Sequence, residues 1–123
     1  MDWTFRADAP IYTQLCERLA LAIASGGYAP GERLPAVREL AVDAGVNPNT
    51  VQRALSELER CGLVYTQRTA GRFVTGDGER IEQEKRRIAE ERARGFLGAM
   101  EELGYGRTQT VALLEKMRGE MET

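Results

Sequence analysis

The chain has 123 residues, of which 42% are hydrophobic and 29% are charged, and its formal net charge is −2. This composition is typical of a folded globular protein rather than a disordered one, and the length allows one compact domain with an extension. The sequence contains no histidine, which removes the commonest general base and metal ligand and excludes most catalytic triads and zinc sites.

Neither a membrane anchor nor a secretory signal is visible. No apolar run has the length that spans a bilayer, and the first residues lack the charged and apolar regions of a signal peptide. We therefore expect a cytoplasmic protein.

Cys16 and Cys61 are far apart and form no CxxC pattern, so we expect two free, mostly buried thiols, with a redox switch as the alternative.

The acidic excess is confined to one part of the chain. Residues 1–76 carry eight arginines against eight acidic residues, so the whole excess lies in residues 77–123. Every basic residue of the first part is an arginine, which suits bidentate hydrogen bonding. Binding to nucleic acid depends on local basic groups rather than on the net charge, so the first part remains compatible with it.

The N-terminal residues predict a short strand and then a helix. Apolar and polar residues alternate over Trp3-Thr4-Phe5, which favours a strand. Apolar residues then recur at helical spacing over residues 10–25, and Gly26-Gly27 ends the predicted helix. We assign Tyr12 and Gln14 to the surface or to packing, with contact to a partner as the alternative.

Two further helices are predicted to form a helix-turn-helix. The first starts after Pro35 and ends near Gly45, and the second covers residues 47–60. Asn47 is a good N-cap, proline is favoured at the first helical position, which Pro48 would occupy, and Gly62 is a stop signal. Two short helices joined by a tight turn that contains glycine are typical of this motif.

The second of these helices begins with hydrogen-bonding side chains and no acid, namely Asn47, Asn49, Thr50, Gln52 and Arg53. Asn and Gln side chains pair with adenine and Arg with guanine, and all of them contact phosphates. Recognition helices contact bases through their N-terminal residues. An ordinary amphipathic helix is the alternative.

Arg38, on the preceding helix, is a candidate phosphate contact. The alternative is a surface ion pair with Glu39 or Asp43.

Two β-prone runs around a polar loop follow, at residues 63–66 and 72–75. They predict a hairpin, and a hairpin directly after a helix-turn-helix is a wing. Arg68 and Arg72 flank its tip.

These motifs together resemble the N-terminal winged helix-turn-helix of GntR-family transcription regulators. The resemblance covers residues 10–75 and is carried by Pro30-Gly31-x-x-Leu34-Pro35-x-x-Arg38-x-Leu40-Ala41, Gly45-Val46, Thr50-Val51-x-x-Ala54-Leu55-x-x-Leu58, Gly62-Leu63-Val64 and Gly71-x-Phe73-Val74. It implies DNA contacts at Arg38, Asn47, Asn49, Thr50, Gln52, Arg53, Arg68 and Gly71. The chain departs from the family pattern at Ala36, where serine is usual, at Pro48, and at a wing tip that lacks the first glycine of Gly-x-Gly.

The residues after the wing predict a helical tail. Gly76-Asp77-Gly78 is expected to be a flexible joint between a DNA-binding domain at 1–76 and a tail at 77–123. A charged helix is predicted over 79–103 and a last helix capped by Thr108. Their apolar residues are too many for two helices to bury, so we expect residues 79–120 to form a homodimer; an antiparallel pair folded onto the winged domain is the alternative. The short tail resembles the YtrA-like subfamily, which implies a small homodimeric repressor.

The fold class is therefore mainly α with a small β-hairpin, and the expected function is a DNA-binding regulator, most simply a repressor on a palindromic operator. A winged-helix module that binds a protein instead of DNA is the alternative, favoured by the acidic net charge. An enzyme has almost no support, because the sequence shows no glycine-rich phosphate loop and no paired acids in a plausible pocket. Adjacent acids such as Glu101-Glu102 are more simply a solvated helix face, and no cofactor is expected. A small-molecule effector stays open, with Phe96 and Tyr105 as candidate cavity residues.

Overall fold

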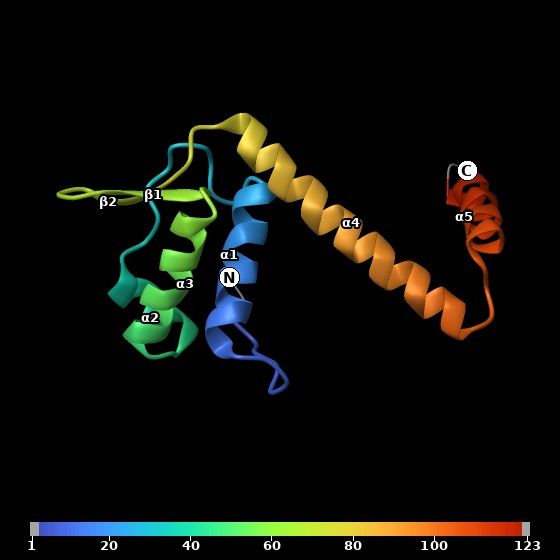
Figure 1. The fold of residues 1–123 in the computed structure, drawn as a ribbon, viewed down its shortest axis with the longest axis horizontal. Helices are drawn as coiled ribbons and strands as arrows, with labels where there is room; N and C mark the ends of the chain where they lie inside the picture. The colour runs from blue at the N-terminus through green and yellow to red at the C-terminus, as the bar shows by residue number, and fades with distance from the viewer. Residues whose placement is uncertain (1–2, 122–123) are drawn as a thin grey trace. The chain divides into compact units, whose positions relative to one another are not determined.

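The computed structural model describes residues 3–121. Over this range the chain forms the helices α1 (Ile11–Ala24), α2 (Val37–Ala44), α3 (Pro48–Arg60), α4 (Gly78–Glu102) and α5 (Arg107–Met121), and the strands β1 (Val64–Gln67) and β2 (Gly71–Val74). The predicted class, mainly α with one hairpin, is confirmed (Figure 1). The chain divides into two compact units, and the boundary between Lys85 and Arg86 lies inside α4.

The core of the first unit lies between α1, α2, α3 and the hairpin. Helical spacing places the apolar residues of each helix on one face, and these faces meet. The fully buried side chains include Leu15, Leu19, Ile23, Val51, Leu55, Leu58, Leu63 and Val74. The apolar stripe predicted for residues 51–58 is thus confirmed as the inward face of α3, and its opposite face is left to solvent.

The turn between α2 and α3 fixes the helix-turn-helix. Gly45 has φ of +68°, a left-handed conformation that glycine adopts at little cost, and the Val46 amide donates to the Ala41 carbonyl at 3.0 Å, as in a Schellman motif. Two residues later, the Asn47 side chain accepts a hydrogen bond from the Asn49 amide at 2.8 Å. The predicted N-cap is confirmed, with Pro48 at the start of α3.

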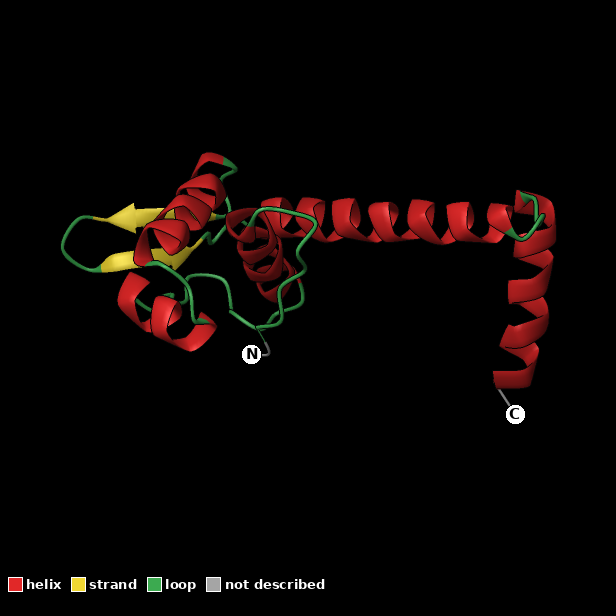
Figure 2. Cartoon of the chain, turned by 90° about the horizontal axis from the view of Figure 1, so that it is seen from below, coloured by secondary structure: helices red, strands yellow, loops and turns green. Residues whose placement is uncertain are grey.

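The predicted hairpin is also confirmed, with Val64 opposite Val74 and Gln67 opposite Gly71. Figure 2 shows the two strands side by side, with their connecting loop extending beyond the helices. A third short segment that the sequence did not reveal pairs with the outer edge of β2. The Leu34 amide donates to the Arg72 carbonyl, and the Val74 amide donates to the Glu32 carbonyl, both at 2.9 Å.

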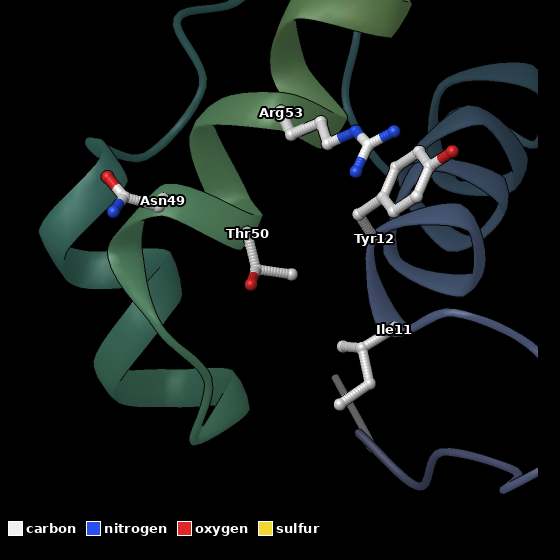
Figure 3. Close-up of a pocket in the computed structure, with 5 residues that line it drawn as sticks. All are labelled: Ile11, Tyr12, Asn49, Thr50 and Arg53. Atoms are coloured by element: carbon white, nitrogen blue, oxygen red, sulfur yellow. The ribbon is translucent and has the colours of Figure 1, made fainter.

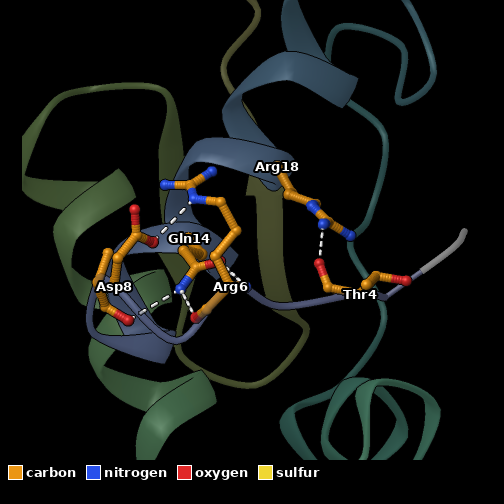
Figure 4. Close-up of polar contacts among 6 residues, drawn as sticks. Thr4, Arg6, Asp8, Gln14 and Arg18 are labelled. Carbon is orange, nitrogen blue, oxygen red and sulfur yellow. Dashed lines mark hydrogen bonds and ion pairs between the residues drawn. The ribbon is translucent and has the colours of Figure 1, made fainter.

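The strand predicted at Trp3–Phe5 is wrong. The segment has no partner strand, and side chains hold it instead. The Trp3 and Phe5 rings stack with centroids 6.1 Å apart, the Arg18 guanidinium lies over both rings, and Arg18 also donates to the Thr4 carbonyl (Figure 4). The prediction rested only on the alternation of apolar and polar residues, but a strand also needs a neighbouring strand for its backbone hydrogen bonds.

Gln14 attaches the same N-terminal segment to α1. Its side chain is 3% exposed; it accepts from the Arg6 amide at 2.8 Å and donates to the carbonyls of Arg6 and Ala9 at 2.8 and 2.9 Å (Figure 4). A buried amide side chain is favourable when its donors and its acceptor are paired in this way. Gln14 is therefore a structural residue, in agreement with its assignment to packing.

The first turns of α4 belong to the first unit. Asp77, expected in a flexible joint, accepts hydrogen bonds from the amides of Glu79 and Arg80 at 3.0 and 3.3 Å and so caps α4. Ile81 is buried in the core cluster, and Arg80 donates to the Cys61 carbonyl at 2.9 Å. The DNA-binding domain predicted at 1–76 lies within this unit, which extends further, to Lys85.

The second unit holds the rest of α4 and α5. The last helix begins at Arg107, so Thr108 is not its cap. The Thr110 hydroxyl instead donates to the Gly106 carbonyl at 2.9 Å. Within α5, residues 107–121, only Thr110 is buried. Within this unit, large apolar side chains remain exposed at Phe96, Leu103, Tyr105, Val111, Leu114, Met117 and Met121.

The two cysteines differ from each other. Both are free thiols, but Cys16 is half-buried and Cys61 is exposed, so the expected burial of Cys61 is wrong. It is the C-cap of α3 and lies beyond Leu58, the last buried residue of that helix. Across residues 3–121, no helix is both long and apolar enough to cross a membrane.

Candidate DNA-binding surface

The outward face of α3 is polar along its first two turns. Asn49, Gln52 and Arg53 are exposed and Thr50 is half-buried, whereas Val51, next to them in sequence, is fully buried. The helix begins with no acidic residue in its first turn. Amide, hydroxyl and guanidinium groups therefore surround the positive end of the helix dipole, which favours an anion there.

The acidic residues of α3 lie at its other end. Glu57 accepts a hydrogen bond from Arg60 at 2.8 Å, and this contact lowers the pKa of the Glu57 carboxyl below its ordinary value. Glu59 accepts a hydrogen bond from the Thr66 hydroxyl. The carboxylates are thus paired near the hairpin, and the N-terminal half of the helix is free of negative charge.

Arg53 lies on the side of α3 that faces α1. Its guanidinium carbon is 3.7 Å from the centroid of the Tyr12 ring, which is within the range of a cation–π interaction. The two residues line a cavity of about 350 Å³ together with Ile11, Asn49 and Thr50. Figure 3 shows the Arg53 and Tyr12 side chains directed at each other from the two helices, while Asn49 points away from α1.

Arg38 is exposed on the first turn of α2. Within residues 3–121, no carboxylate lies within ion-pair distance of its guanidinium. Asp43, suggested from the sequence as its partner, instead accepts a hydrogen bond from the Trp3 indole at 2.7 Å. The positive charge of Arg38 is therefore available to a partner outside the chain.

The hairpin tip has a tight geometry. Residues 68–70 connect the strands, the Ala70 amide donates to the Gln67 carbonyl at 3.0 Å, and Gly71 begins β2 with φ of +107°. Arg68 is exposed at the tip. A side chain at Gly71 would meet the Arg33 side chain, whose Nε lies 3.1 Å from the Cβ position, so glycine is needed here on structural grounds.

The structure adds two residues to those that the sequence singled out. The Arg33 side chain lies against Gly71, at the loop end of the hairpin, and Tyr12 supports Arg53. The first was missed because residues 30–35 show only turn signals, and pairing with β2 is a tertiary event. For Tyr12 the sequence favours the surface or packing, since a single tyrosine at helical spacing carries no specific signal.

Comparison with protein families gives one clear match. The model of the bacterial regulatory proteins of the gntR family matches residues 11–74, which is more than half of the chain. The HTH-type transcriptional regulator YhcF of Bacillus subtilis is 39% identical over 104 residues, covering 85% of this chain and 86% of YhcF. The HTH-type transcriptional repressor YtrA of Bacillus subtilis is 41% identical over 70 residues, covering 57% of this chain and 54% of YtrA.

Solved structures agree with this match. A GntR family transcriptional regulator from Listeria monocytogenes has a TM-score of 0.82 at 38% identity, covering 91% of this chain and 98% of that one. AraR(DBD), crystallised in complex with operator ORX1, has a TM-score of 0.57 at 28% identity, covering 61% of this chain and 96% of that one. On the fold, the family match and these similarities together, the chain belongs to the GntR family of bacterial regulatory proteins and is a transcriptional regulator.

Proposed function

We propose that this regulator is a repressor that binds a palindromic operator as a homodimer. In this proposal α3 enters the major groove with its N-terminal end, α2 crosses the DNA backbone, and the wing contacts the flanking groove. The observation that carries the proposal is the exposed, acid-free start of α3. Support also comes from the relatives, since AraR(DBD) was crystallised with operator DNA and YtrA is described as a repressor.

Each element of the surface has a distinct part. Asn49 and Gln52 are exposed on α3 and are suited to adenine, because an amide side chain donates and accepts at once. Arg38 and Arg68 are exposed on α2 and at the wing tip and are suited to phosphates. The Asn47 side-chain oxygen is used in capping, which leaves its amide group to donate, and Gly71 shapes the wing rather than offering a side chain.

The homodimer is proposed from the second unit. Its exposed apolar residues include Phe96 at 43%, Leu114 at 46% and Met117 at 43% of full exposure. Apolar groups in such numbers on a small unit are unfavourable in water, and a two-fold copy of the same surface would cover them. Two identical winged domains joined in this way would present two recognition helices, which is the arrangement that a palindromic site requires.

Selection from a random duplex library tests the proposal. The protein is incubated with the library, the bound duplexes are amplified, and the cycle is repeated before sequencing. We expect a palindrome whose half-site centres are about one helical turn, or a multiple of it, apart. Recovery of a single unrepeated half-site would contradict the dimer, and recovery of no preferred sequence would contradict sequence-specific binding. Repression is tested separately with a reporter gene placed behind the selected site.

A further inference from the structure

We propose that Tyr12 is a positioning residue for DNA binding, which holds the Arg53 guanidinium in place to bind one phosphate of the DNA backbone. The inference rests on the proposed DNA-binding function and deepens it, because it assigns Arg53 to a phosphate rather than to a base and adds a residue of α1 to the surface. The juxtaposition of the two side chains across α1 and α3 is the observation that suggests it (Figure 3).

The pair has the geometry of a cation–π stack. A guanidinium at 3.7 Å from a ring centroid lies on the face of the ring, where both the quadrupole and the flat shapes favour contact. Arginine otherwise has many rotamers to lose on binding DNA. A stacked guanidinium has lost part of this freedom in the unbound protein, and the ring leaves the N–H groups at its rim available to accept an anion.

The composition of the cavity also favours an anion. Besides the pair, it is lined by Thr50, Asn49 and the apolar Ile11, and the Asn49 side chain points away from α1 (Figure 3). The guanidinium brings its N–H donors and a positive charge to this cavity. Within residues 3–121, no carboxylate lies within ion-pair distance of Arg53, and the nearest acid along α3, Glu57, is bound to Arg60. This is the chemistry of a phosphate site.

The position of Arg53 on α3 favours a phosphate over a base. A recognition helix in the major groove directs the middle of its outer face at the base edges, and residues at its margins meet the groove walls, which are phosphates. Arg53 and Thr50 lie at the margin of α3 that faces α1, whereas Asn49 points away from α1. The stack with Tyr12 keeps Arg53 at this margin and away from the base edges.

The test measures binding to two duplexes, the operator selected by the wild-type protein and a scrambled duplex of equal length, over a series of salt concentrations. The variants are Arg53→Ala, Tyr12→Leu, Tyr12→Phe and the double variant Arg53→Ala/Tyr12→Leu. Arg60→Ala is the matched control, because it removes the same charge from the far end of the same helix. Thermal unfolding of each variant shows that the fold is retained.

We expect Arg53→Ala to weaken binding to both duplexes by a similar factor and to reduce the slope of log K against log salt by about 0.9 per protomer. Tyr12→Leu should weaken binding by roughly two- to fivefold per protomer, in line with a partly exposed cation–π contact. Tyr12→Phe should restore most of the affinity, since the ring face is kept. In the Arg53→Ala background, Tyr12→Leu should have no further effect, and Arg60→Ala should bind as the wild type does.

Three outcomes would overturn the inference. Loss of binding by Arg53→Ala on the operator alone would assign Arg53 to a base. Equal effects of Tyr12→Leu with and without Arg53 would show that Tyr12 does not act through the arginine. Wild-type affinity of Tyr12→Leu would show that the stack is irrelevant to binding. Failure of the proposed function is distinguished from all of these, because the wild-type protein itself would then show no preference between the two duplexes.

Discussion

Arg80, on the first turns of α4, donates a hydrogen bond from Nε to the carbonyl oxygen of Cys61, 2.9 Å away at the end of α3. The last carbonyls of a helix have no partner within the helix, so this contact satisfies one of them and ties α4 to the recognition helix. The other end of the guanidinium lies 3.5 Å from the carboxylate of Glu84, which is buried.

We predict that Arg80→Met lowers the free energy of unfolding by about 1–3 kcal/mol, because it removes a charged donor and leaves the buried Glu84 with one partner fewer. Urea denaturation measures the change. Arg6→Met is the control, since the Arg6–Asp8 pair is exposed and should contribute about 0.5 kcal/mol or less. Equal losses in the two variants would contradict a structural role for the Arg80 contact.

Two substitutions at Asn47 separate folding from DNA binding. Asn47→Ala removes the cap of α3 and should lower the free energy of unfolding by about 1 kcal/mol. Asn47→Asp keeps an oxygen for the Asn49 amide and places a negative charge at the helix N-terminus, so stability should be unchanged or higher. We expect the affinity for DNA to fall in both variants, because both lose the Asn47 side-chain amide donor. In Asn47→Asp the added negative charge would also repel DNA phosphates. Asn47→Asp with wild-type affinity would remove this position from the DNA-binding surface.

The proposed dimer predicts a change of mass in solution. The chain has a mass of 13.7 kDa, and sedimentation of the wild-type protein should give twice this value. Combining Phe96→Glu with Leu114→Glu places charges on the exposed apolar surface of the second unit and should yield monomers. Val42→Glu, a matched change at a residue of α2 that is 84% exposed, should leave the dimer intact. A wild-type monomer, or a dimer that the double variant does not disturb, would contradict the assignment.

Cys16 predicts a dependence of stability on pH. Burial, and then the charges of Cys61, Glu57 and other nearby acids, raise the pKa of the Cys16 thiol from 9.0 to about 11. The folded state therefore holds this proton more tightly than the unfolded state does, so the contribution to stability is complete below pH 9 and is lost as the pH rises toward 11. Unfolding measured at pH 8 and pH 10.5 should show a smaller pH-induced loss for Cys16→Ala than for the wild type. An equal loss of stability in Cys16→Ala and the wild type would contradict the raised pKa of Cys16.

Much of the first unit follows from its sequence, because the local signals and the packing agree. Asn47 caps α3 and Gly45 takes the left-handed turn, and both are residues whose preferences operate within a few positions of the chain. Apolar spacing likewise placed Val51, Leu55 and Leu58 on the buried face, since a helix with one apolar face has few ways to pack.

The features that the sequence did not reveal depend on contacts between distant segments. The pairing of Leu34 with Arg72 follows from the position of the hairpin edge, and the stack of Arg53 on Tyr12 follows from the packing of α1 against α3. The strand expected at Trp3–Phe5 failed for the same reason, because the aromatic rings found partners within the first unit whereas the backbone found no neighbouring strand.

Arg38→Ala is the sharpest test of whether this regulator uses α2, α3 and the wing to bind operator DNA. Binding of the wild-type protein, Arg38→Ala and Arg60→Ala is measured on the selected operator and on scrambled DNA over a salt series. We predict a wild-type slope of roughly −5 to −9, as ~6–10 phosphate contacts require, a clear preference for the operator, and loss of this tight binding in Arg38→Ala alone. Equal, weak binding of both duplexes by all three proteins would contradict the account.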